Sequence, residues 1–430
     1  MDFDYLSLDE KRSLHQKLLY RLFLHAKCHP LTKNRLEQIE GTVTEANILS
    51  KWQHILPEDT SDHKPLLIEQ FSKIATLNRD RGSAIVISSG GTQGAPLSTC
   101  LSFDEIINNC YFQGKGYFTA GIQQNHTVAT FGIPSLLSSE FTVYHGLKHT
   151  ACLILPIGIS DDPEKIVSLI EDFAANVLLV MPSDLIPIIQ YLDASNKKLD
   201  RIKLIVTGGE KLREDLVERI TSRIGIENLK LRSTFQTSDT GSIGFQCDSV
   251  KTDAYHIHEE LQLVEIIKDE DDDNCLVVTN LNRYLFPVIR LKTGDIAEWA
   301  DMKECPCGRK SRIIKLKGRK SRYIKIGGEK FDQEVLHSIP FLFKIPIEAC
   351  AWRLRITNGN QEEFVFKIHS DYRNKINGDT LKNELNKGNS KFSHQSTMKI
   401  ISELKIEELN SSDVVYSASG KRKFLIDERT

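Results

Sequence analysis

The stretch 151–182, ACLILPIGISDDPEKIVSLIEDFAANVLLVMP, contains two apolar runs with a helical segment between them. Each run is far shorter than the roughly 20 residues needed to cross a bilayer, so both are interpreted as buried strands. Asp161 or Asp162 can cap the helix, and Pro163 suits its first turn. The apolar face of the helix is marked by Ile166, Val167, Leu169 and Ile170. This order predicts parallel strands joined by a crossover helix.

The same alternation extends to both sides of this unit. The β-rich runs SAIVIS, TVATFG and LIVTGG occupy 83–88, 127–132 and 204–209, with helical stretches between them. From about residue 65 to 240 the sequence therefore predicts an α/β core of parallel strands and crossover helices. The next stretch, 255–317, is strand-rich without helical periodicity. Its acidic tract KDEDDDN is expected to be a solvated hairpin turn rather than a metal site.

Length and composition limit the class of protein. The chain has 430 residues, enough for two or three domains, and a formal charge of −2. This balance argues against a nucleic-acid-coating protein, and 40% apolar residues argue against a disordered one. Nine scattered cysteines and the polar start MDFDYLSLDEKR, without a signal-peptide core, lead us to expect a reducing cytoplasm. We expect no nucleic-acid partner and no membrane, and a monomer or a homodimer.

The pattern of predicted helices and strands changes near the segment GRKSRYIKIGGEKF, 318–331, which indicates a second domain. After it, short helices alternate with the strands IPIEACAWRLRI and EEFVFKI. We expect a large N-terminal domain over 1–319, made of α/β layers plus a β-rich subdomain. A small mobile α+β domain is expected over 320–430, with a hinge near 319–322.

A Gly/Ser/Thr loop, VISSGGTQGAPLS at 86–98, directly follows the first predicted strand. Its glycines let the backbone approach an anion, and its hydroxyls and amides can donate to phosphate oxygens. It is neither a Walker loop nor the dinucleotide pattern G-x-G-x-x-G. Taken alone, such a segment is more often only a turn. The candidate phosphate ligands are Ser88, Ser89, Gly90, Gly91, Thr92 and Gly94.

Further segments follow the loop in a fixed order. They are TGGEKL (207–212), STFQTSDTG (233–241), FPVIRLKTGDIAEW (286–299), GRKSRYIKIGGEKF (318–331) and SASGKRKF (417–424). With these motifs the chain resembles the adenylate-forming superfamily of acyl-CoA synthetases and adenylation domains. Within it, the chain is most similar to phenylacetate-CoA ligases and capsule-biosynthesis-type ligases. The resemblance implies that superfamily's fold and use of ATP and Mg²⁺. A carboxylate would attack the α-phosphorus of ATP, giving acyl-AMP and pyrophosphate.

The resemblance also implies a nucleotide site. Phe235 would stack on adenine, and Thr237 or Ser238 would bond the α-phosphate. Asp295 would accept hydrogen bonds from both ribose hydroxyls, and Arg319 would contact the nucleotide from the hinge. The full set of nucleotide contacts is Gly209, Glu210, Phe235, Gln236, Thr237, Ser238, Asp295 and Arg319.

One lysine and one carboxylate carry the implied chemistry. Lys421 would bridge the incoming carboxylate and the α-phosphate, and would swing in and out with the small domain. Asp239 stands where the family normally has Glu as a ligand for Mg²⁺, and it is one methylene shorter. Gln93 and Ser321 are further departures from the family pattern. The alternative to a ligase is therefore a nucleotide-binding scaffold that no longer catalyses.

The acid and the acyl acceptor are less defined by sequence. A pocket for an aryl or medium acyl group is expected behind TFGIPSLLSSEF and MPSD. Its candidate residues are Phe131, Gly132, Ile133, Ser135 and Ser183. Coenzyme A is the expected acceptor, reaching the adenylate through a tunnel bordered by Gly327 and Gly328. A carrier-protein thiol or an amine is the alternative acceptor.

Four side chains form a candidate zinc site. Cys305 and Cys307 are a close thiol pair, and Cys247 and His256 stand as in relatives whose Cys and His segments match. Together they would make a tetrahedral Cys₃His site, with His258 as the alternate nitrogen ligand. Simple burial of the thiols is the competing interpretation.

Overall fold

The chain forms two compact units, which divide between Lys317 and Gly318. The computed structural model describes residues 3–59, 82–88, 98–132, 139–158, 162–212, 214–225, 228–250, 253–269, 272–301, 304–320, 323–326, 329–357, 362–388, 404–415 and 424–428. The domain limits 1–319 and 320–430, and the mobility of the smaller domain, remain predictions.

The first unit contains one large mixed sheet and a separate hairpin. Its strands are β1 Glu58–Asp59, β2 Ala84–Ser88, β3 Ser98–Ser102, β4 Thr127–Gly132, β5 Leu153–Gly158, β6 Val177–Val180, β7 Leu204–Gly208, β8 Lys230–Thr237, β9 Gly241–Phe245, β10 Ala254–Ile257, β11 Gln262–Lys268, β12 Asn274–Asn280, β13 Leu291–Trp299 and β14 Ile313–Arg319. The large sheet has 12 strands in the order β11-β12-β13-β14-β10-β9-β8-β7-β6-β4-β5, with β1 paired to β13. Neighbours from β5 to β8 are parallel, which confirms the predicted α/β core.

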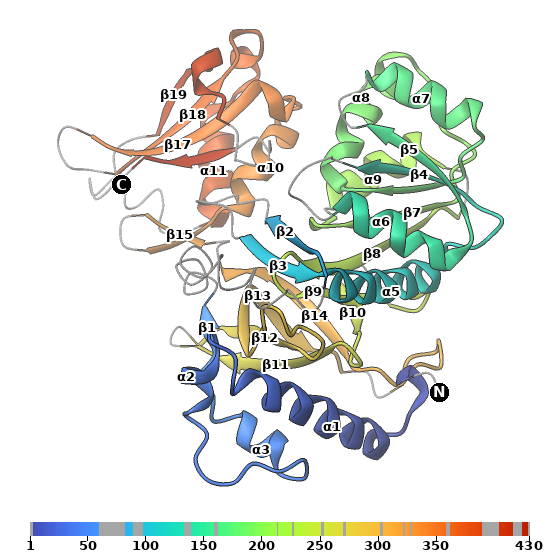
Figure 1. Cartoon of the computed structure of the whole chain (residues 1–430). Coiled ribbons are helices and arrows are strands. Elements are labelled where there is room, and N and C mark those ends of the chain that lie inside the picture. Colours follow the sequence, from blue (N-terminus) through green and yellow to red (C-terminus); the bar gives the residue numbers. More distant parts are fainter. Residues whose placement is uncertain are drawn as a thin grey trace. The chain divides into compact units, whose positions relative to one another are not determined.

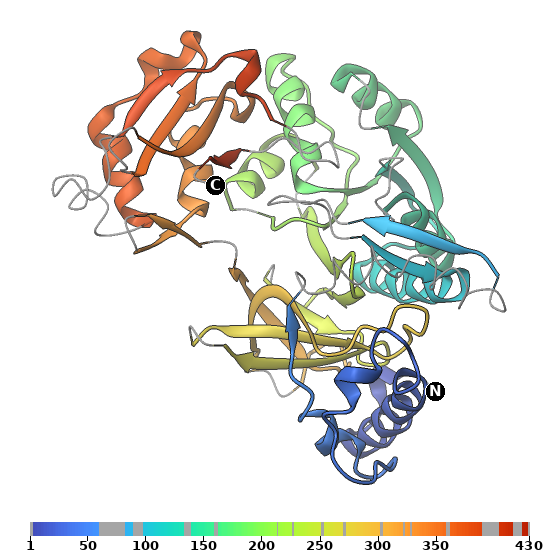
Figure 2. The ribbon, with the colours of Figure 1, turned by 60° about the vertical axis from the view of Figure 1, so that its left-hand side comes forward.

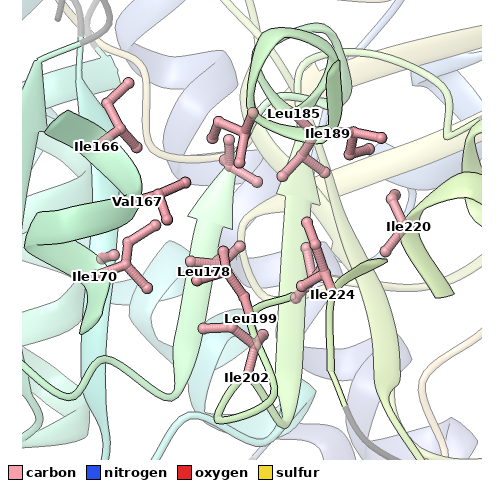
Figure 3. Packing of buried hydrophobic residues seen from close by; sticks show 14 of the residues in the cluster. Ile166, Val167, Ile170, Leu178, Leu185, Ile189, Leu199, Ile202, Ile220 and Ile224 are labelled. Carbon is pink, nitrogen blue, oxygen red and sulfur yellow. The ribbon is translucent and has the colours of Figure 1, made fainter. Parts of the chain in front are cut away.

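Helices cover both faces of the parallel half (Figure 1). They are α5 Phe103–Ala120, α6 Ser139–Leu147, α7 Pro163–Asp172, α8 Leu185–Ala194 and α9 Glu214–Arg223. Alternate side chains of β6 point to opposite faces, so Val177 packs with residues of α5 and α6. Leu178 packs instead in a cluster with Ile170, Ile189 and Ile220 of α7, α8 and α9 (Figure 3).

The helix predicted between the two apolar runs is α7. Asp162 is its N-cap and accepts the N–H of Glu164 at 2.9 Å, with Pro163 in the first turn. Ile166, Val167 and Ile170 are buried, as their spacing predicts. Burial of each such side chain contributes about 1.5–3 kcal/mol, which holds the crossover against the sheet.

The pairing predicted for one strand was wrong. The run SAIVIS does form β2, but β2 pairs antiparallel with β3, Ser88 opposite Ser98, in a two-stranded sheet of its own. The connection between them is too short for a parallel crossover, which takes about a dozen residues or more. The Gly/Ser/Thr loop therefore joins the two strands of a hairpin.

The antiparallel half of the large sheet carries the β-rich part of the sequence. Strands β11 and β12 pair antiparallel with Lys268 opposite Asn274, so the acidic tract does join the two strands of a hairpin. The N-terminal helices α1 Leu8–Ala26, α2 Lys33–Leu36 and α3 Ile48–Trp52 lie beside this half (Figures 1 and 2). Their buried residues share a cluster with Leu281 and Ile289. Buried Lys11 pairs with buried Glu259 at 2.8 Å, which ties α1 to the sheet.

The second unit is a small α+β fold. Its strands are β15 Tyr323–Ile326, β16 Glu329–Asp332, β17 Cys350–Ile356, β18 Glu362–Ile368, β19 Lys405–Glu408 and β20 Leu425–Asp427, and its helices are α10 Glu334–Leu342 and α11 Gly378–Gly388. Four strands form a sheet in the order β19-β18-β17-β20. Both helices pack on it around Trp352 and Phe366, whose rings stack at 4.5 Å. Among the described helices of either unit, none has the length and apolarity of a membrane span.

Candidate functional site

The carboxyl ends of four parallel strands meet at one edge of the large sheet. Gly208 of β7 lies opposite Thr234 of β8, and Thr207 opposite Val180 of β6. Thr130 of β4 lies opposite Leu179 of β6. In open α/β sheets, ligands bind outside this edge. The structure brings to it the candidates Phe131, Gly132, Gly209, Glu210, Phe235, Gln236 and Thr237.

The turn after β7 needs a glycine. Gly209 has φ +76°, a conformation that side chains with a Cβ rarely adopt. A Cβ there would also lie 3.6 Å from the sulfur of Met181, which follows β6. The motif TGGE thus brings Glu210, which is half-buried, to the edge beside β6.

An unpredicted tyrosine interacts with two of the nucleotide candidates. The rings of Phe235 and Tyr255 lie 5.6 Å apart, and Tyr255 on β10 is only 7% exposed. Burial, followed by the charges of Asp253 and Asp295, raises the pKa of Tyr255. Asp295, itself buried, donates its N–H to Thr293 Oγ1 at 3.2 Å. Phe235 therefore contacts Tyr255 directly, whereas Asp295 acts on the same side chain through its charge.

The turn from β8 to β9 holds the phosphate and metal candidates. Thr237 Oγ1 accepts the N–H of Thr240 at 3.1 Å and lies 2.9 Å from the Thr240 hydroxyl. The Thr237 hydroxyl is thus committed to the turn. Ser238 and Asp239 stand at the tip, both half-buried. The strand register shifts before the turn, because Phe235 pairs with Gly244 and Gln236 with Ser242. Such bulges re-aim side chains and are common beside active sites.

Several predicted residues lie outside this arrangement. Those that lie outside the residues that the structure describes are Ser89, Gly90, Gly91, Thr92, Gln93, Gly94, Ile133, Ser135, Ser321, Gly327, Gly328 and Lys421. Ser88 ends β2 and Ser183 lies in the 3₁₀ turn Pro182–Asp184, where only their backbone is described. Arg319 is the exposed last residue of β14 and belongs to the second unit.

The four predicted zinc ligands come together in the antiparallel half. The Sγ atoms of Cys247, Cys305 and Cys307 and a ring nitrogen of His256 all lie within 4.8 Å of one another. Cys247 Sγ is 3.6 Å from both Cys305 Sγ and His256 Nε2, and Cys307 Sγ is 3.5 Å from the same nitrogen. Around a tetrahedral zinc ion, sulfur ligands stand about 3.8 Å apart and sulfur and nitrogen about 3.6 Å. The donor set and its spacing therefore fit zinc.

The surroundings of the cluster suit metal ligands. Burial lowers the pKa of His256 to about 4, which keeps its ring in the neutral form that binds metals. Its Nδ1 lies 3.0 Å from Ser311 Oγ, which leaves Nε2 to the sulfurs. Burial opposes ionisation of Cys307, but hydrogen bonds from the Arg309 N–H and from Cys305 outweigh it and lower the pKa of Cys307.

The alternate ligand His258 is not part of the cluster. Its ring packs 4.7 Å from that of Phe245 and 5.6 Å from that of Phe112. His258 is buried, and burial holds its pKa well below the usual range. All nine cysteines are free thiols in this structure, so the cluster contains no disulfide.

Comparisons with known proteins agree with the motifs. No protein-family profile matches the chain. Over 221 residues it is 24% identical to a phenylacetate-coenzyme A ligase of Pseudomonas putida, covering 49% of either chain. Over 222 residues it is 24% identical to the Escherichia coli phenylacetate-coenzyme A ligase, again covering 49% of each. The chain thus spans about half the length of the curated relatives it matches.

Solved structures extend the similarity to the whole fold. 2-Hydroxyisobutyryl-CoA ligase in the postadenylation state superimposes with a TM-score of 0.69 at 15% identity, over 99% of this chain and 91% of the other. ATP-bound MatB of Rhodopseudomonas palustris gives a TM-score of 0.54 at 14% identity, over 79% and 66%. The predicted resemblance is confirmed: the chain has the fold of the adenylate-forming superfamily and is related in sequence to its phenylacetate-CoA ligases.

Proposed function

We propose that this chain is an ATP-dependent acid ligase that forms an acyl-adenylate and then a coenzyme A thioester. The observation that carries the proposal is the carboxyl edge of the parallel strands, where Gly209 and Glu210 follow β7 beside Phe235 of β8. This edge is where open α/β sheets bind nucleotides. Relatives named as acid–coenzyme A ligases support the choice of acceptor.

The nucleotide would be held by side chains from both halves of the sheet. Phe235 would stack on the base, and buried Asp295 would accept the ribose hydroxyls. Because the Thr237 hydroxyl is committed to its own turn, Ser238 is the better candidate for the α-phosphate. Gln236 would line the same site, while Arg319 and Lys421 would contact the nucleotide from the second unit.

Asp239 is the proposed ligand for Mg²⁺. It is a half-buried carboxylate at the tip of the turn that also carries Ser238, and carboxylate oxygens suit this hard cation. Mg²⁺ would offset the charge of the ATP phosphates. The shorter Asp side chain places its oxygens closer to the backbone than a Glu would. The turn must therefore be held firmly.

The acid would bind behind the ends of β4 and β6. Phe131, 8% exposed, and Gly132 close β4, and the 3₁₀ turn with Ser183 follows β6. An apolar pocket at these strand ends would suit an aryl or medium acyl group. Ile133 and Ser135 continue this segment in the sequence.

Acid-dependent exchange of pyrophosphate into ATP tests the first step. A panel of aryl and acyl carboxylates should include at least one that supports exchange. Tight ATP or AMP binding without exchange for any acid would favour the non-catalytic scaffold. With a productive acid, coenzyme A, a carrier-protein thiol and an amine are offered separately. The acceptor consumed with release of AMP identifies the second step.

Zinc would stabilise the antiparallel half by joining β9–β10 to the segment before β14. Metal analysis of the purified chain should give about one zinc per chain. Cys247→Ser should lose the metal and lower the melting temperature. Cys110→Ser, which alters a buried thiol on α5 outside the cluster, should retain it. Purified wild-type chain without zinc would favour simple burial of the thiols.

A further inference from the structure

Arg283 is a buried cation that belongs to none of the ordered motifs. It is 2% exposed and lies between β12 and β13, just before the motif at 286–299. Burial lowers the pKa of its guanidinium, although the charges of Glu105 and Asp239 oppose this. Because an ionised group is costly to bury, it is retained only where its hydrogen bonds are made. The position of those bonds indicates what the side chain does.

The guanidinium joins two parts of the candidate site. Its Nη2 donates to Thr99 Oγ1 at 2.7 Å and to the Cys100 carbonyl at 3.2 Å. Its Nη1 donates to the main-chain carbonyl of Asp239 at 3.2 Å. Thr99 and Cys100 are the second and third residues of β3, the strand that follows the Gly/Ser/Thr loop in the sequence. The planar guanidinium therefore links the start of β3, which follows the Gly/Ser/Thr loop in the sequence, to the turn that carries Asp239, the proposed Mg²⁺ ligand.

The segment around Arg283 is itself fixed from α5. Glu105 Oε1 accepts the N–H groups of Tyr284 at 2.5 Å and Leu285 at 2.8 Å. The other carboxylate oxygen, Oε2, accepts the N–H of Ser102 at the end of β3. Glu105 is 5% exposed, so these are buried, charge-assisted hydrogen bonds. Arg283 is thus presented from an anchored backbone.

Buried amides hold the rest of the turn. Asn280 Nδ2 donates to the Thr240 carbonyl at 2.7 Å. Gln262 Nε2 donates to the same carbonyl at 2.8 Å and to the Ser242 carbonyl at 2.9 Å. These contacts tie Thr240 and Ser242 to β11 and β12, while the Asp239 carbonyl accepts from Arg283. Among these side chains, it is the Arg283 guanidinium that connects Asp239 to the hairpin β2–β3.

We propose that Arg283 is a positioning residue that fixes the Asp239 turn relative to strand β3, and so sets where the Asp239 carboxylate can meet the Mg²⁺ of bound ATP. The inference rests on the proposed function. Arg283 lies behind the turn and acts through the Asp239 carbonyl, not through the ligand. Its loss should weaken binding of magnesium-bound ATP more than binding of the acid.

Hydrogen exchange tests the link without any ligand. Arg283→Met keeps a long apolar side chain but removes every donor. We expect faster amide exchange in both 98–102 and 237–242. Arg290→Met is the matched control, because Arg290 is also buried and pairs with Glu265 at 2.9 Å, away from the turn. It should leave both segments unchanged. Arg283→Met without faster exchange in both segments overturns the link.

Magnesium dependence then tests the role. For Arg283→Met the Mg²⁺ concentration that gives half-maximal ATP binding should rise about tenfold, with Arg283→Lys between it and wild type. The KM for the acid should stay within about twofold. An unchanged Mg²⁺ dependence alongside normal wild-type ATP binding overturns the positioning role. A wild-type chain that binds no ATP instead overturns the proposed function, while hydrogen exchange still decides the link. If Arg283→Met does not fold, Arg283→Lys serves in both experiments with the same direction of change.

Discussion

The two halves of the large sheet place functional side chains in different ways. In the parallel half, β5 to β8, the candidates stand where strands end, and α5–α9 cover the faces (Figure 1). In the antiparallel half the candidates lie inside strands: Asp295 within β13 and Tyr255 within β10. A strand end can vary its loop freely, whereas a mid-strand residue is fixed by the register of its neighbours. The antiparallel half should therefore tolerate less change at its site positions.

The largest effect is expected from a residue in neither half. Lys421→Ala should lower acyl-adenylate formation about 100- to 1000-fold, because the charge on the transferring phosphate loses its partner. Transfer from a supplied acyl-adenylate should continue. Pyrophosphate exchange and thioester formation, measured separately, check this. Lys423→Ala, in the same tail, is the control. Equal loss of both half-reactions would contradict an alternation of the small domain between them.

Asp295→Ala tests the antiparallel half. Removing a buried acceptor of two ribose hydroxyls should raise the KM for ATP about 10- to 100-fold. Asp253→Ala is the matched control, because Asp253 also raises the pKa of Tyr255 but is more exposed. It should leave the KM for ATP nearly unchanged. Equal effects of the two substitutions would point to Tyr255 rather than to a ribose contact.

Gly241→Ala tests the junction where the halves meet. Gly241 has φ +81°, and a Cβ there would overlap Asn109 Oδ1, which accepts the N–H of Ser242 at 2.7 Å. We expect a loss of about 1–3 kcal/mol of unfolding free energy. Gly294→Ala is matched in backbone, at φ +80°, with nothing within 4 Å of its Cβ. Denaturant titration should show the smaller loss there, and a reversed order would refute the overlap argument.

Phe235→Ala tests the end of the parallel half and has the smallest expected effect. Loss of stacking should raise the KM for ATP by up to about tenfold. Phe235→Tyr, which keeps the ring, should stay near wild type. If both variants weaken ATP binding alike, the ring does not stack on the base. Its role would then be to pack against Tyr255, whose ring lies 5.6 Å away.

The apolar runs predicted the parallel strands correctly, and β6 and β7 are buried along nearly their whole length. The burial predicted for the run ACLILP was wrong, because β5 is the last strand in the sheet order and buries only Ile157. The partner of β2 was missed because pairing depends on the length of the connection as well as on the strand itself. Tyr255 and Arg283 were missed for a related reason. Neither stands in a motif, and both act through contacts with residues distant in sequence, as the 184-residue separation of Arg283 and Thr99 illustrates.

The zinc candidates show the opposite case. Cys247 and His256 were connected to Cys305 and Cys307 only through the resemblance, and the fold brings their ligand atoms within 4.8 Å. Spacing alone would not have chosen His256 over His258. Alternation along β10 does not separate the two, because residues two apart in a strand share a face. His258 lies past the end of β10, and its ring packs against Phe112 and Phe245 instead.

The register shift between β8 and β9 limits how this region can change in length. Ile243 is the residue of β9 that the shift leaves without an opposite partner, and it is fully buried. Because strand side chains alternate, deleting Ile243 would exchange the faces of Gly241 and Ser242 and carry the Ser238–Asp239 tip with them. A substitution in this hairpin changes one side chain and can have a small effect. A single-residue insertion or deletion changes the faces of several side chains at once. The segment STFQTSDTGSIG should therefore tolerate substitutions far better than changes in length.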